Sequence, residues 1–441
     1  MRRIYDDSYL ERSPRHQRRR RSRLGSLNVK NVRLWAVGLV LLLVFIFFIS
    51  CLLTAADANI GPAVAETVHQ IKAPPGNKPP APGVWANAAV LTDAESGRVL
   101  YDKAAHVKLP IASTTKMITA LVVRERKKLS DKVVISPEAA VVGEQGIDLT
   151  PGETLTVEQL LNALLIQSAN DAAYALAQGT AGSIEAFSAL MNKKAAELGA
   201  NESHFVNPHG LDQADHYSSA YDLAVIGRAL MKDPVLAKIV STPHYSIPWP
   251  GHAGPRVAQN HNEILTKYQG ADGIKTGYTV PAGWCLVASA KRDGKSLIAA
   301  VLNSSHRVDD AAALFNYGFS STARIVLASR GHRVGTSRVG AFPRRYVTVV
   351  PQAEMAALTF KGSNDVFKVK VVVERTAHSP VKKGEALGKI DALLNDSLLE
   401  KGNAVAATSQ SSSNFLGAIY FFFWYSLCWT GKMLAAPFRI F

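Results

Sequence analysis

Residues 110–120, PIASTTKMITA, place Ser113 and Lys116 three positions apart at the start of a predicted helix. Residues with this spacing lie on one helical face, so the two side chains can touch. A serine hydroxyl becomes a nucleophile when a base takes its proton, and a lysine serves as that base when burial or a neighbouring cation lowers its pKa. Alone, the pattern is a weak signal, because a serine at a helix start followed by a surface lysine is common.

A second polar cluster, Ser168-Ala169-Asn170, interrupts the helical sequence LLIQSANDAAYALA at residues 164–177. A hydroxyl and an amide held together on a rigid turn can relay a proton and bind a substrate amide. Taken alone, Ser168 or Asn170 would instead be interpreted as the N-cap of the following helix.

A third cluster, Lys275-Thr276-Gly277, lies on a predicted strand that leads to Tyr278. The lysine and the threonine offer a cation and a hydroxyl to a substrate carboxylate, and Gly277 leaves room for a peptide along the strand edge. The backbone N–H groups of Tyr278 and Ser113 can form an oxyanion hole. The competing interpretation is a strand followed by an ordinary turn.

The three clusters together are far more specific than each one alone. They occur as Ser-x-x-Lys, Ser-x-Asn and Lys-Thr-Gly on a helix start, an inter-helix loop and a strand, which is the signature of penicillin-binding proteins and class A β-lactamases. The sequence resembles the low-molecular-mass D-alanyl-D-alanine carboxypeptidases over roughly residues 86–430. The stretches that carry this resemblance are PIASTTKMITA, LLIQSANDAAYALA, FVNPHGLD (205–212), HYSSAYDLA (216–224) and DGIKTGYTVPAGWCLVASAKR (272–292).

The resemblance implies a serine-type, penicillin-sensitive hydrolase (peptidase S11-like) that removes the terminal D-Ala from peptidoglycan pentapeptides through an acyl-enzyme. The implied catalytic residues are Ser113, Lys116, Ser168 and Asn170. The implied substrate-binding residues are Lys275, Thr276, Gly277, Tyr278 and Arg307, the last joining Thr276 at the terminal carboxylate. The implied partners are peptidoglycan stem peptides, β-lactam antibiotics and a membrane, with neither a metal nor an organic cofactor, and a weak homo-oligomer is left open.

The sequence leaves two other functions open. It argues against a third, a β-lactamase. The chain could be an endopeptidase that cleaves peptidoglycan cross-links, or a non-catalytic scaffold that binds the cell wall with the same fold. Class A β-lactamases carry Glu-x-x-Leu-Asn after Ser-x-Asn, whereas here the matching residues 158–162 precede it. Glu158 is therefore interpreted as an exposed acid in a first helical turn. His204 and His209 lack the spacing of a helical metal site.

Hydrophobic periodicity predicts a mixed α/β domain followed by a smaller all-β domain. Strand-like runs at both ends of the first domain enclose the helical stretches, so an antiparallel sheet closed by distant segments is expected beside a helical subdomain, as in the β-lactamase/transpeptidase-like fold. The predicted strands lie in a hairpin at 88–102 and at 283–290 and 296–302. The predicted helices lie at 116–128, 156–166, 171–178, 183–199 and 310–319. The two domains are predicted at 85–328 and 329–406.

Two apolar segments flank these domains. Residues 35–53 are long enough to span a bilayer, and the basic tail 1–34 before them should stay cytoplasmic, which sends the rest of the chain outside. An uncleaved anchor is favoured over a cleaved signal peptide or a lipid-modified Cys51. A proline-rich linker is predicted at 54–84. Residues 407–441 are interpreted as a tether and an aromatic anchor in the membrane interface, with a helix packed on the core as the alternative.

The distribution of charge argues against a nucleic-acid enzyme. The net charge is +15, but the tail 1–34 carries 11 Lys/Arg against 3 Asp/Glu, and residues 330–441 carry 15 against 7. The segment between them, where the three clusters lie, is nearly neutral. The apolar segment 35–53 and the basic tail before it predict a location at the bacterial cytoplasmic membrane, with the catalytic domain on its outer side.

Overall fold

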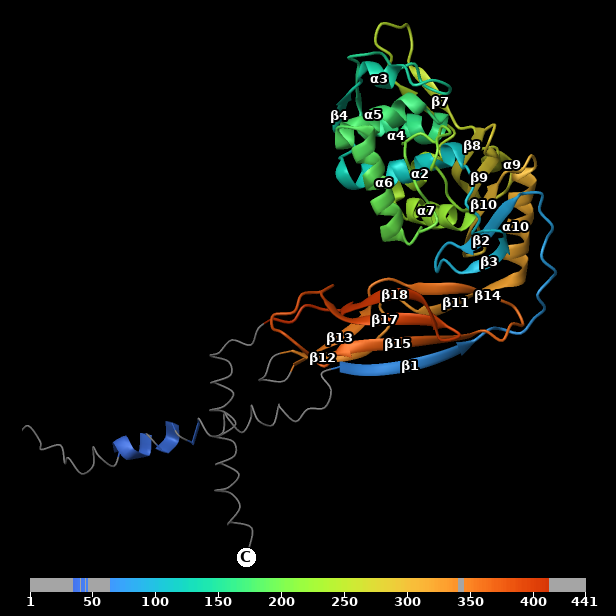
Figure 1. Cartoon of the computed structure of the whole chain (residues 1–441). Helices are drawn as coiled ribbons and strands as arrows, with labels where there is room; N and C mark the ends of the chain where they lie inside the picture. The colour runs from blue at the N-terminus through green and yellow to red at the C-terminus, as the bar shows by residue number, and fades with distance from the viewer. Residues whose placement is uncertain (1–34, 40, 44, 47–63, 340–344, 412–441) are drawn as a thin grey trace, which may run out of the picture. The chain divides into compact units, whose positions relative to one another are not determined.

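The computed structural model describes residues 35–39, 41–43, 45–46, 64–339 and 345–411 (Figure 1). The chain divides into two units, residues 1–63 and 64–441, and the description below concerns the second. The predicted basic tail, part of the apolar segment 35–53 and the aromatic anchor lie outside the described residues. No helix among the described residues is both long and apolar enough to cross a membrane.

A five-stranded antiparallel sheet forms the centre of the first domain. Its order, β3-β2-β10-β9-β8, joins strands from the start of the domain to strands from its end, which confirms the predicted closure by distant segments. The strands are β2 (Ala88–Asp93), β3 (Val99–Lys103), β8 (Ala271–Thr279), β9 (Gly283–Arg292) and β10 (Lys295–Leu302). The predicted hairpin and the two predicted late strands are all present.

Helices cover both faces of this sheet. Successive residues of a strand point to opposite faces, and Leu297 and Ile298 of β10 accordingly belong to two separate hydrophobic cores. Helix α7 (Ala220–Lys232) contributes to the core that contains Ile298, and α10 (Arg307–Ser321) to the core that contains Leu297. The burial of six consecutive residues of β2 fits a strand covered on both sides.

Most of the remaining helices form a subdomain around α2, whose residues 116–123 are all buried. These helices are α2 (Lys116–Arg126), α3 (Pro137–Ala140), α4 (Val157–Asn162), α5 (Asn170–Ala181), α6 (Ile184–Leu198) and α8 (Pro234–Val240), with a 3₁₀ turn η1 (Ala112–Thr115). The short helix α9 (Ile264–Lys267) lies apart from them, because its Ile264 belongs to the same core as α10. The predicted helix 156–166 differs in detail. It begins with a capping box on Thr156, but continues from α4 as a π-helical turn, η2 (Ala163–Gln167), which ends at Ser168 in the left-handed conformation.

The second domain is all-β and has its own hydrophobic core. Its main sheet has the order β1-β15-β17-β18-β13-β12-β16, and β11 pairs with β14 beside it. The strands are β1 (Val64–Lys72), β11 (Thr322–Ala328), β12 (Gly335–Val339), β13 (Arg345–Pro351), β14 (Met355–Phe360), β15 (Val366–Glu374), β16 (Thr376–Ala377), β17 (Ala386–Leu394) and β18 (Ser397–Ala406). This domain begins before the predicted boundary at 329, because α10 runs directly into β11.

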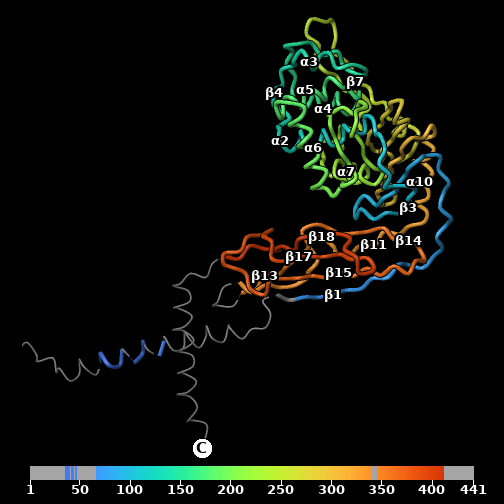
Figure 2. Tube along the Cα trace, viewed as in Figure 1, coloured from blue at the N-terminus to red at the C-terminus, as the bar shows by residue number. Residues whose placement is uncertain are grey.

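One strand of the second domain comes from the predicted linker 54–84. Figure 2 shows β1 beside β15, and the two pair from Val64↔Glu374 to Lys72↔Val366. The prediction missed β1 because it is an edge strand: its residues 66–70 are all exposed, so no alternation of polar and apolar residues marks it. The proline-rich residues 73–84 form neither helix nor strand, as predicted.

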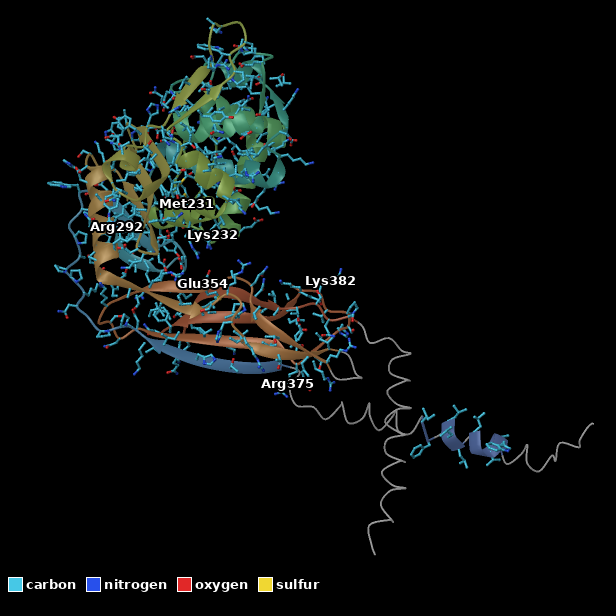
Figure 3. The ribbon with its side chains drawn as sticks, turned by 180° about the vertical axis from the view of Figure 1, so that it is seen from behind. Met231, Lys232, Arg292, Glu354, Arg375 and Lys382 are labelled. Carbon is cyan, nitrogen blue, oxygen red and sulfur yellow. The ribbon has the colours of Figure 1, made fainter. Side chains whose placement is uncertain are left out.

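Polar contacts join the two domains next to the β2–β3 hairpin. Asp93 accepts a hydrogen bond of 2.9 Å from the backbone N–H of Leu358, and Arg98 forms a 2.7 Å ion pair with Asp365. Arg324 of β11 bridges Glu95 and Glu354, the latter labelled in Figure 3. Most of these side chains are partly buried, so the contacts position the hairpin on the second domain.

Two smaller two-stranded hairpins also belong to the first domain. They pair β4 (Lys132–Val134) with β5 (Thr154–Thr156) and β6 (His244–Ile247) with β7 (Arg256–Gln259). A buried ion pair of 2.6 Å between Arg256 and Glu153 ties one hairpin to the other.

Candidate active site

Ser113 and Lys116 meet at the junction of η1 and α2. The Lys116 ammonium nitrogen, Nζ, lies 2.8 Å from the Ser113 hydroxyl oxygen, 2.6 Å from Asn170 Oδ1 and 2.9 Å from the backbone carbonyl of His209. The residue before the serine, Ala112, has a φ of 47°, a strained value for a residue with a Cβ. Gly210 makes room for this turn, because a Cβ there would lie 2.0 Å from the carbonyl oxygen of Ala112.

The environment of Lys116 favours its neutral form. The side chain is fully buried, and burial, followed by the charge of Lys275, lowers the pKa of Lys116 well below its usual value. Desolvation penalises the ammonium, and a nearby like charge does the same. A neutral amine at hydrogen-bonding distance from a serine hydroxyl can accept its proton.

Ser168 and Asn170 lie beside this pair, between η2 and α5. The carboxamide of Asn170 accepts a hydrogen bond from Lys116 and donates one of 3.0 Å to the carbonyl of Gly143. The N-cap of α5 is Ala169, which has no side-chain cap, so the side chains of Ser168 and Asn170 do not perform the capping that was the competing interpretation. Both are nearly buried, which restricts their orientation.

Strand β8 forms the facing wall and runs close to the serine. A Cβ at Gly277 would lie 2.9 Å from the backbone nitrogen of Ser113, so only glycine lets the strand approach this near. Lys275 is 3% exposed and donates a 3.0 Å hydrogen bond to the carbonyl of Thr276. Burial lowers the pKa of Lys275 to about 7. The buried cation behind this wall is therefore one that titrates near neutrality.

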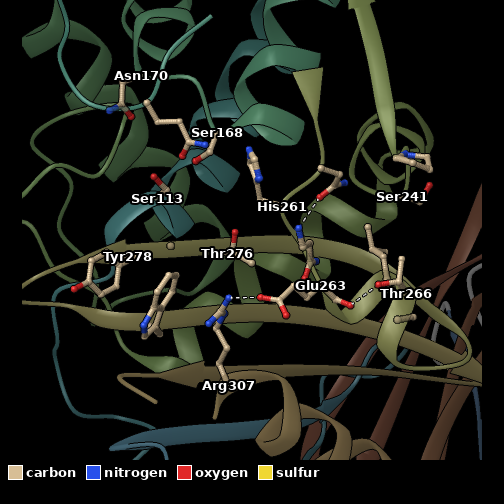
Figure 4. A pocket seen from close by; sticks show the side chains of 18 of the residues that line it. Ser113, Ser168, Asn170, Ser241, His261, Glu263, Thr266, Thr276, Tyr278 and Arg307 are labelled. Atoms are coloured by element: carbon tan, nitrogen blue, oxygen red, sulfur yellow. Dashed lines mark hydrogen bonds and ion pairs between the residues drawn. The ribbon is translucent and has the colours of Figure 1, made fainter. Parts of the chain in front are cut away.

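A cleft of about 800 Å³ opens above these residues. Seven of the nine predicted site residues line it, and Figure 4 shows Ser113, Ser168 and Asn170 on one side and Thr276, Tyr278 and Arg307 on the other. The two remaining predicted residues, Lys116 and Lys275, are buried beside it. The structure therefore brings all three sequence clusters and Arg307 together.

Arg307 is held at the cleft by two neighbours. Its guanidinium donates a 2.9 Å hydrogen bond to Glu263 and lies 4.2 Å from the centre of the Trp284 ring. Within the described residues its Nε is buried without a hydrogen-bond partner, so a ligand in the cleft would meet the terminal nitrogens of the guanidinium. Together with the hydroxyl of Thr276, it offers a carboxylate two donors on the same wall.

Several residues that line the cleft were missed by the sequence analysis. Five of them lie in loops with no motif or periodicity: Glu144, Gln145, His261, Asn262 and Glu263. The sixth, Trp284, lies on β9. Asn207 and His209 lie in a loop next to Lys116. Asn207 accepts a 2.7 Å hydrogen bond from the N–H of Gly210, and His209 contributes its carbonyl to Lys116. Burial lowers the pKa of His209 to about 3, so its imidazole is neutral.

Comparisons with known proteins agree with this geometry. The family model for D-alanyl-D-alanine carboxypeptidase, Peptidase S11, matches residues 76–306, and the model for the penicillin-binding protein 5 C-terminal domain matches residues 325–411. The D-alanyl-D-alanine carboxypeptidase DacF of Bacillus subtilis is 34% identical over 342 residues, which cover 75% of this chain and 87% of DacF. DacC of Escherichia coli is 32% identical over 361 residues, which cover 78% and 88%.

Solved structures of penicillin-binding proteins and D-alanyl-D-alanine carboxypeptidases also resemble this chain. Penicillin-binding protein 5 from Haemophilus influenzae superposes with a TM-score of 0.59 at 26% identity, covering 76% of this chain and all (100%) of that one. A D-alanyl-D-alanine carboxypeptidase from Mycobacterium tuberculosis superposes with a TM-score of 0.53 at 36% identity, covering 56% of this chain and 96% of that one. The two family models together match both domains, and the predicted β-lactamase/transpeptidase-like fold with its all-β second domain is confirmed. The chain therefore belongs to the D-alanyl-D-alanine carboxypeptidase family, peptidase S11.

Proposed function

We propose that this chain is a serine carboxypeptidase that removes the terminal D-Ala from peptidoglycan pentapeptides through an acyl-enzyme on Ser113. The observation that carries this proposal is the buried contact between Lys116 and Ser113, 2.8 Å long, in a cleft whose facing wall presents Thr276 and Arg307. A neutral base, a nucleophile and a carboxylate-binding wall are the parts that cleavage next to a terminal carboxylate requires.

Acylation begins with the hydroxyl of Ser113. Its oxygen attacks the carbonyl of the penultimate D-Ala, and Lys116 accepts the hydroxyl proton. The backbone N–H groups of Ser113 and Tyr278 stabilise the oxyanion. The proton that Lys116 accepted then passes through the hydroxyl of Ser168 to the departing amine, which returns Lys116 to its neutral form, the C–N bond breaks and D-Ala leaves. Thr276 and Arg307 hold its carboxylate throughout, so the scissile bond stays beside the nucleophile.

Deacylation reverses these roles with water as the nucleophile. Lys116 accepts a proton from water, which attacks the ester carbonyl, and the oxygen of Ser113 leaves and regains a proton. The shortened peptide is released. A penicillin presents a strained amide next to a carboxylate and would acylate Ser113 by the same route. Because its ring-opened product stays attached to the acyl group, it would block the approach of water and inhibit the enzyme.

The test of this function is D-Ala release by the full-length chain in detergent from a D-Ala-D-Ala pentapeptide, with and without penicillin. We expect release that stops after penicillin treatment. Cleavage of cross-linked dimers without release from the pentapeptide would favour an endopeptidase instead. Binding of the peptide with neither reaction would favour a cell-wall-binding scaffold.

Lys275→Gln tests the coupling between the two buried lysines. Removing the charge of Lys275 should raise the pKa of Lys116, so a higher pH is needed to make Lys116 neutral. The acid limb of the pH profile for acylation by penicillin should therefore move to higher pH. In the wild type, the alkaline limb should fall as Lys275 loses its proton near pH 7, and this limb should disappear in the variant.

The control for this variant is Lys291→Gln, an exposed lysine at the end of β9. It should keep the wild-type profile. A Lys275→Gln enzyme whose acid limb stays in place would show that the charge of Lys275 does not control Lys116.

The proposed location is the outer face of the bacterial cytoplasmic membrane. The apolar residues 35–53, the basic residues 18–23 before them and the aromatic residues 415–429 support it, because they match an anchor, a cytoplasmic flank and an interfacial segment. Protease added to intact spheroplasts should digest residues 64–411 and spare the basic tail. Protection of the catalytic domain in intact spheroplasts would contradict this location.

A further inference from the structure

Glu263 is an acid of the cleft that contacts the proposed carboxylate-binding residue, Arg307. Its Oε1 accepts a 2.9 Å hydrogen bond from Nη2 of Arg307, which Figure 4 draws as a dashed line. The terminal carboxylate of the proposed substrate would bind the same guanidinium. The free protein therefore already holds a carboxylate where the substrate would place its own.

The geometry of Arg307 makes the two carboxylates competitors. Its Nε is buried, so a ligand in the cleft can reach only the terminal nitrogens, Nη1 and Nη2. A carboxylate binds a guanidinium most strongly through two parallel hydrogen bonds. The substrate can form both of them only if Glu263 gives up Nη2. A carboxylate that bound beside Glu263 without displacing it would meet a like charge at short range.

The backbones of Glu263 and Arg307 are held next to each other by packing. Glu263 is the N-cap residue of α9, and the following residue, Ile264, is fully buried in the core to which α10 also contributes. Tyr268, at the C-terminal end of α9, donates a 2.8 Å hydrogen bond to Asn316 of α10. Arg307 is the first residue of α10. The contact between the two side chains is therefore built on two elements that are fixed to each other.

Lys267 gives Glu263 a second partner one helical turn away. Its ammonium lies 2.5 Å from Oε2 of Glu263, at the i,i+4 spacing of a helical ion pair. The hydrogen bond from Lys267 and the charge of Arg307 lower the pKa of Glu263, so the side chain is ionised at neutral pH. Because this side chain is 45% exposed, it has room to rotate away from Arg307 while it keeps its contact with Lys267.

We propose that Glu263 is an internal competitor for the carboxylate site: it occupies Arg307 in the free enzyme and yields it to the terminal carboxylate of the substrate. This inference rests on the proposed function, because it takes Arg307 as the group that binds that carboxylate. Glu263 weakens the binding of leaving groups that carry a carboxylate and takes no part in bond breaking. Lys267 holds Glu263 in the released position and so acts in the opposite direction.

The experiment compares two thioesters of N-benzoyl-D-alanine with the full-length chain and measures the thiol that hydrolysis releases. One has mercaptoacetate as its leaving group and so carries a carboxylate, and the other has the uncharged mercaptoacetamide of nearly the same shape. Glu263→Gln should lower KM and raise kcat/KM for the carboxylate thioester by about twofold to fivefold, the range of an exposed ion pair. The values for the amide thioester should stay close to those of the wild type, because it has no charge for Glu263 to repel.

Lys267→Gln should have the opposite effect and raise KM for the carboxylate thioester, because Glu263 is then left with Arg307 alone. The matched control is Glu197→Gln. Glu197 is an exposed glutamate of α6 that pairs with Lys193 at the same i,i+4 spacing and does not line the cleft. This variant should keep the wild-type values for both thioesters.

An unchanged KM for the carboxylate thioester in Glu263→Gln would overturn the inference. A higher KM would also overturn it and would show that Glu263 only positions Arg307. A wild type that hydrolyses both thioesters with equal kcat/KM would show that Arg307 is not a carboxylate site, which removes the competition. If the wild type hydrolyses neither thioester and is not acylated by penicillin, the proposed function itself has failed, so the two failures are distinguishable.

Discussion

Ser113→Ala should lower D-Ala release by at least about 10⁴-fold and abolish the penicillin adduct. In the described cleft, the Ser113 hydroxyl is the one that lies 2.8 Å from the Lys116 amine, and loss of a covalent nucleophile removes the whole reaction path rather than one contribution to it. The measurement is steady-state release of D-Ala together with the intact mass of the protein after penicillin treatment.

Ser320→Ala, an exposed serine near the end of α10, serves as the control and should behave as the wild type. The thermal midpoint of Ser113→Ala, measured by circular dichroism, should lie within a few degrees of the wild-type value. The substitution removes one oxygen atom and adds no atom that could clash with its neighbours. Substantial release by a folded Ser113→Ala enzyme would rule out the proposed nucleophile.

Lys116→Gln should lower the rate of acylation by penicillin by about 10³- to 10⁴-fold. Glutamine can keep hydrogen bonds in the buried position, but it cannot accept the proton of Ser113. The second expected result is qualitative: the acid limb of the pH profile should vanish, because the group that titrates there is gone. The measurement is the second-order rate of acylation across the pH range in which the wild-type rate rises.

Lys128→Gln, an exposed lysine just beyond α2, controls for the loss of a positive charge and should leave both rate and profile as in the wild type. A Lys116→Gln enzyme that acylates slowly but keeps the wild-type acid limb would assign the titrating base to another group. The thermal midpoint of the variant must be measured alongside, because Lys116 is fully buried and satisfies three acceptors.

The parts of the fold that could be predicted are those whose apolar residues form a continuous run or recur at a regular spacing. The hairpin at 88–102 and the strands that became β9 and β10 are marked by apolar runs, since both faces of the sheet are covered. The site was predictable because three short motifs carry it, and their chemistry requires particular residue types at fixed spacing. Arg307 came from the family resemblance alone.

Other features depend on contacts that no local pattern records. Strand β1 lies at an edge of the sheet, and its residues 66–70 are all exposed, so no alternating pattern marks it in the sequence. The loop of Glu144 is positioned by Asn170 and Asp171, and the hairpin of β6 and β7 by the ion pair between Arg256 and Glu153, residues far apart in the chain. The walls of the cleft were therefore less predictable than its catalytic centre.

The central claim is that Ser113 is the residue that becomes acylated, and the most direct measurement locates the acyl group. Full-length protein treated with penicillin should gain the mass of one penicillin, and peptide mapping should place it on the segment that contains Ser113. Incubation with a D-Ala-D-Ala pentapeptide before penicillin should slow the labelling, because both compete for the same serine. An adduct on any other residue, or no adduct in folded protein, would contradict the account.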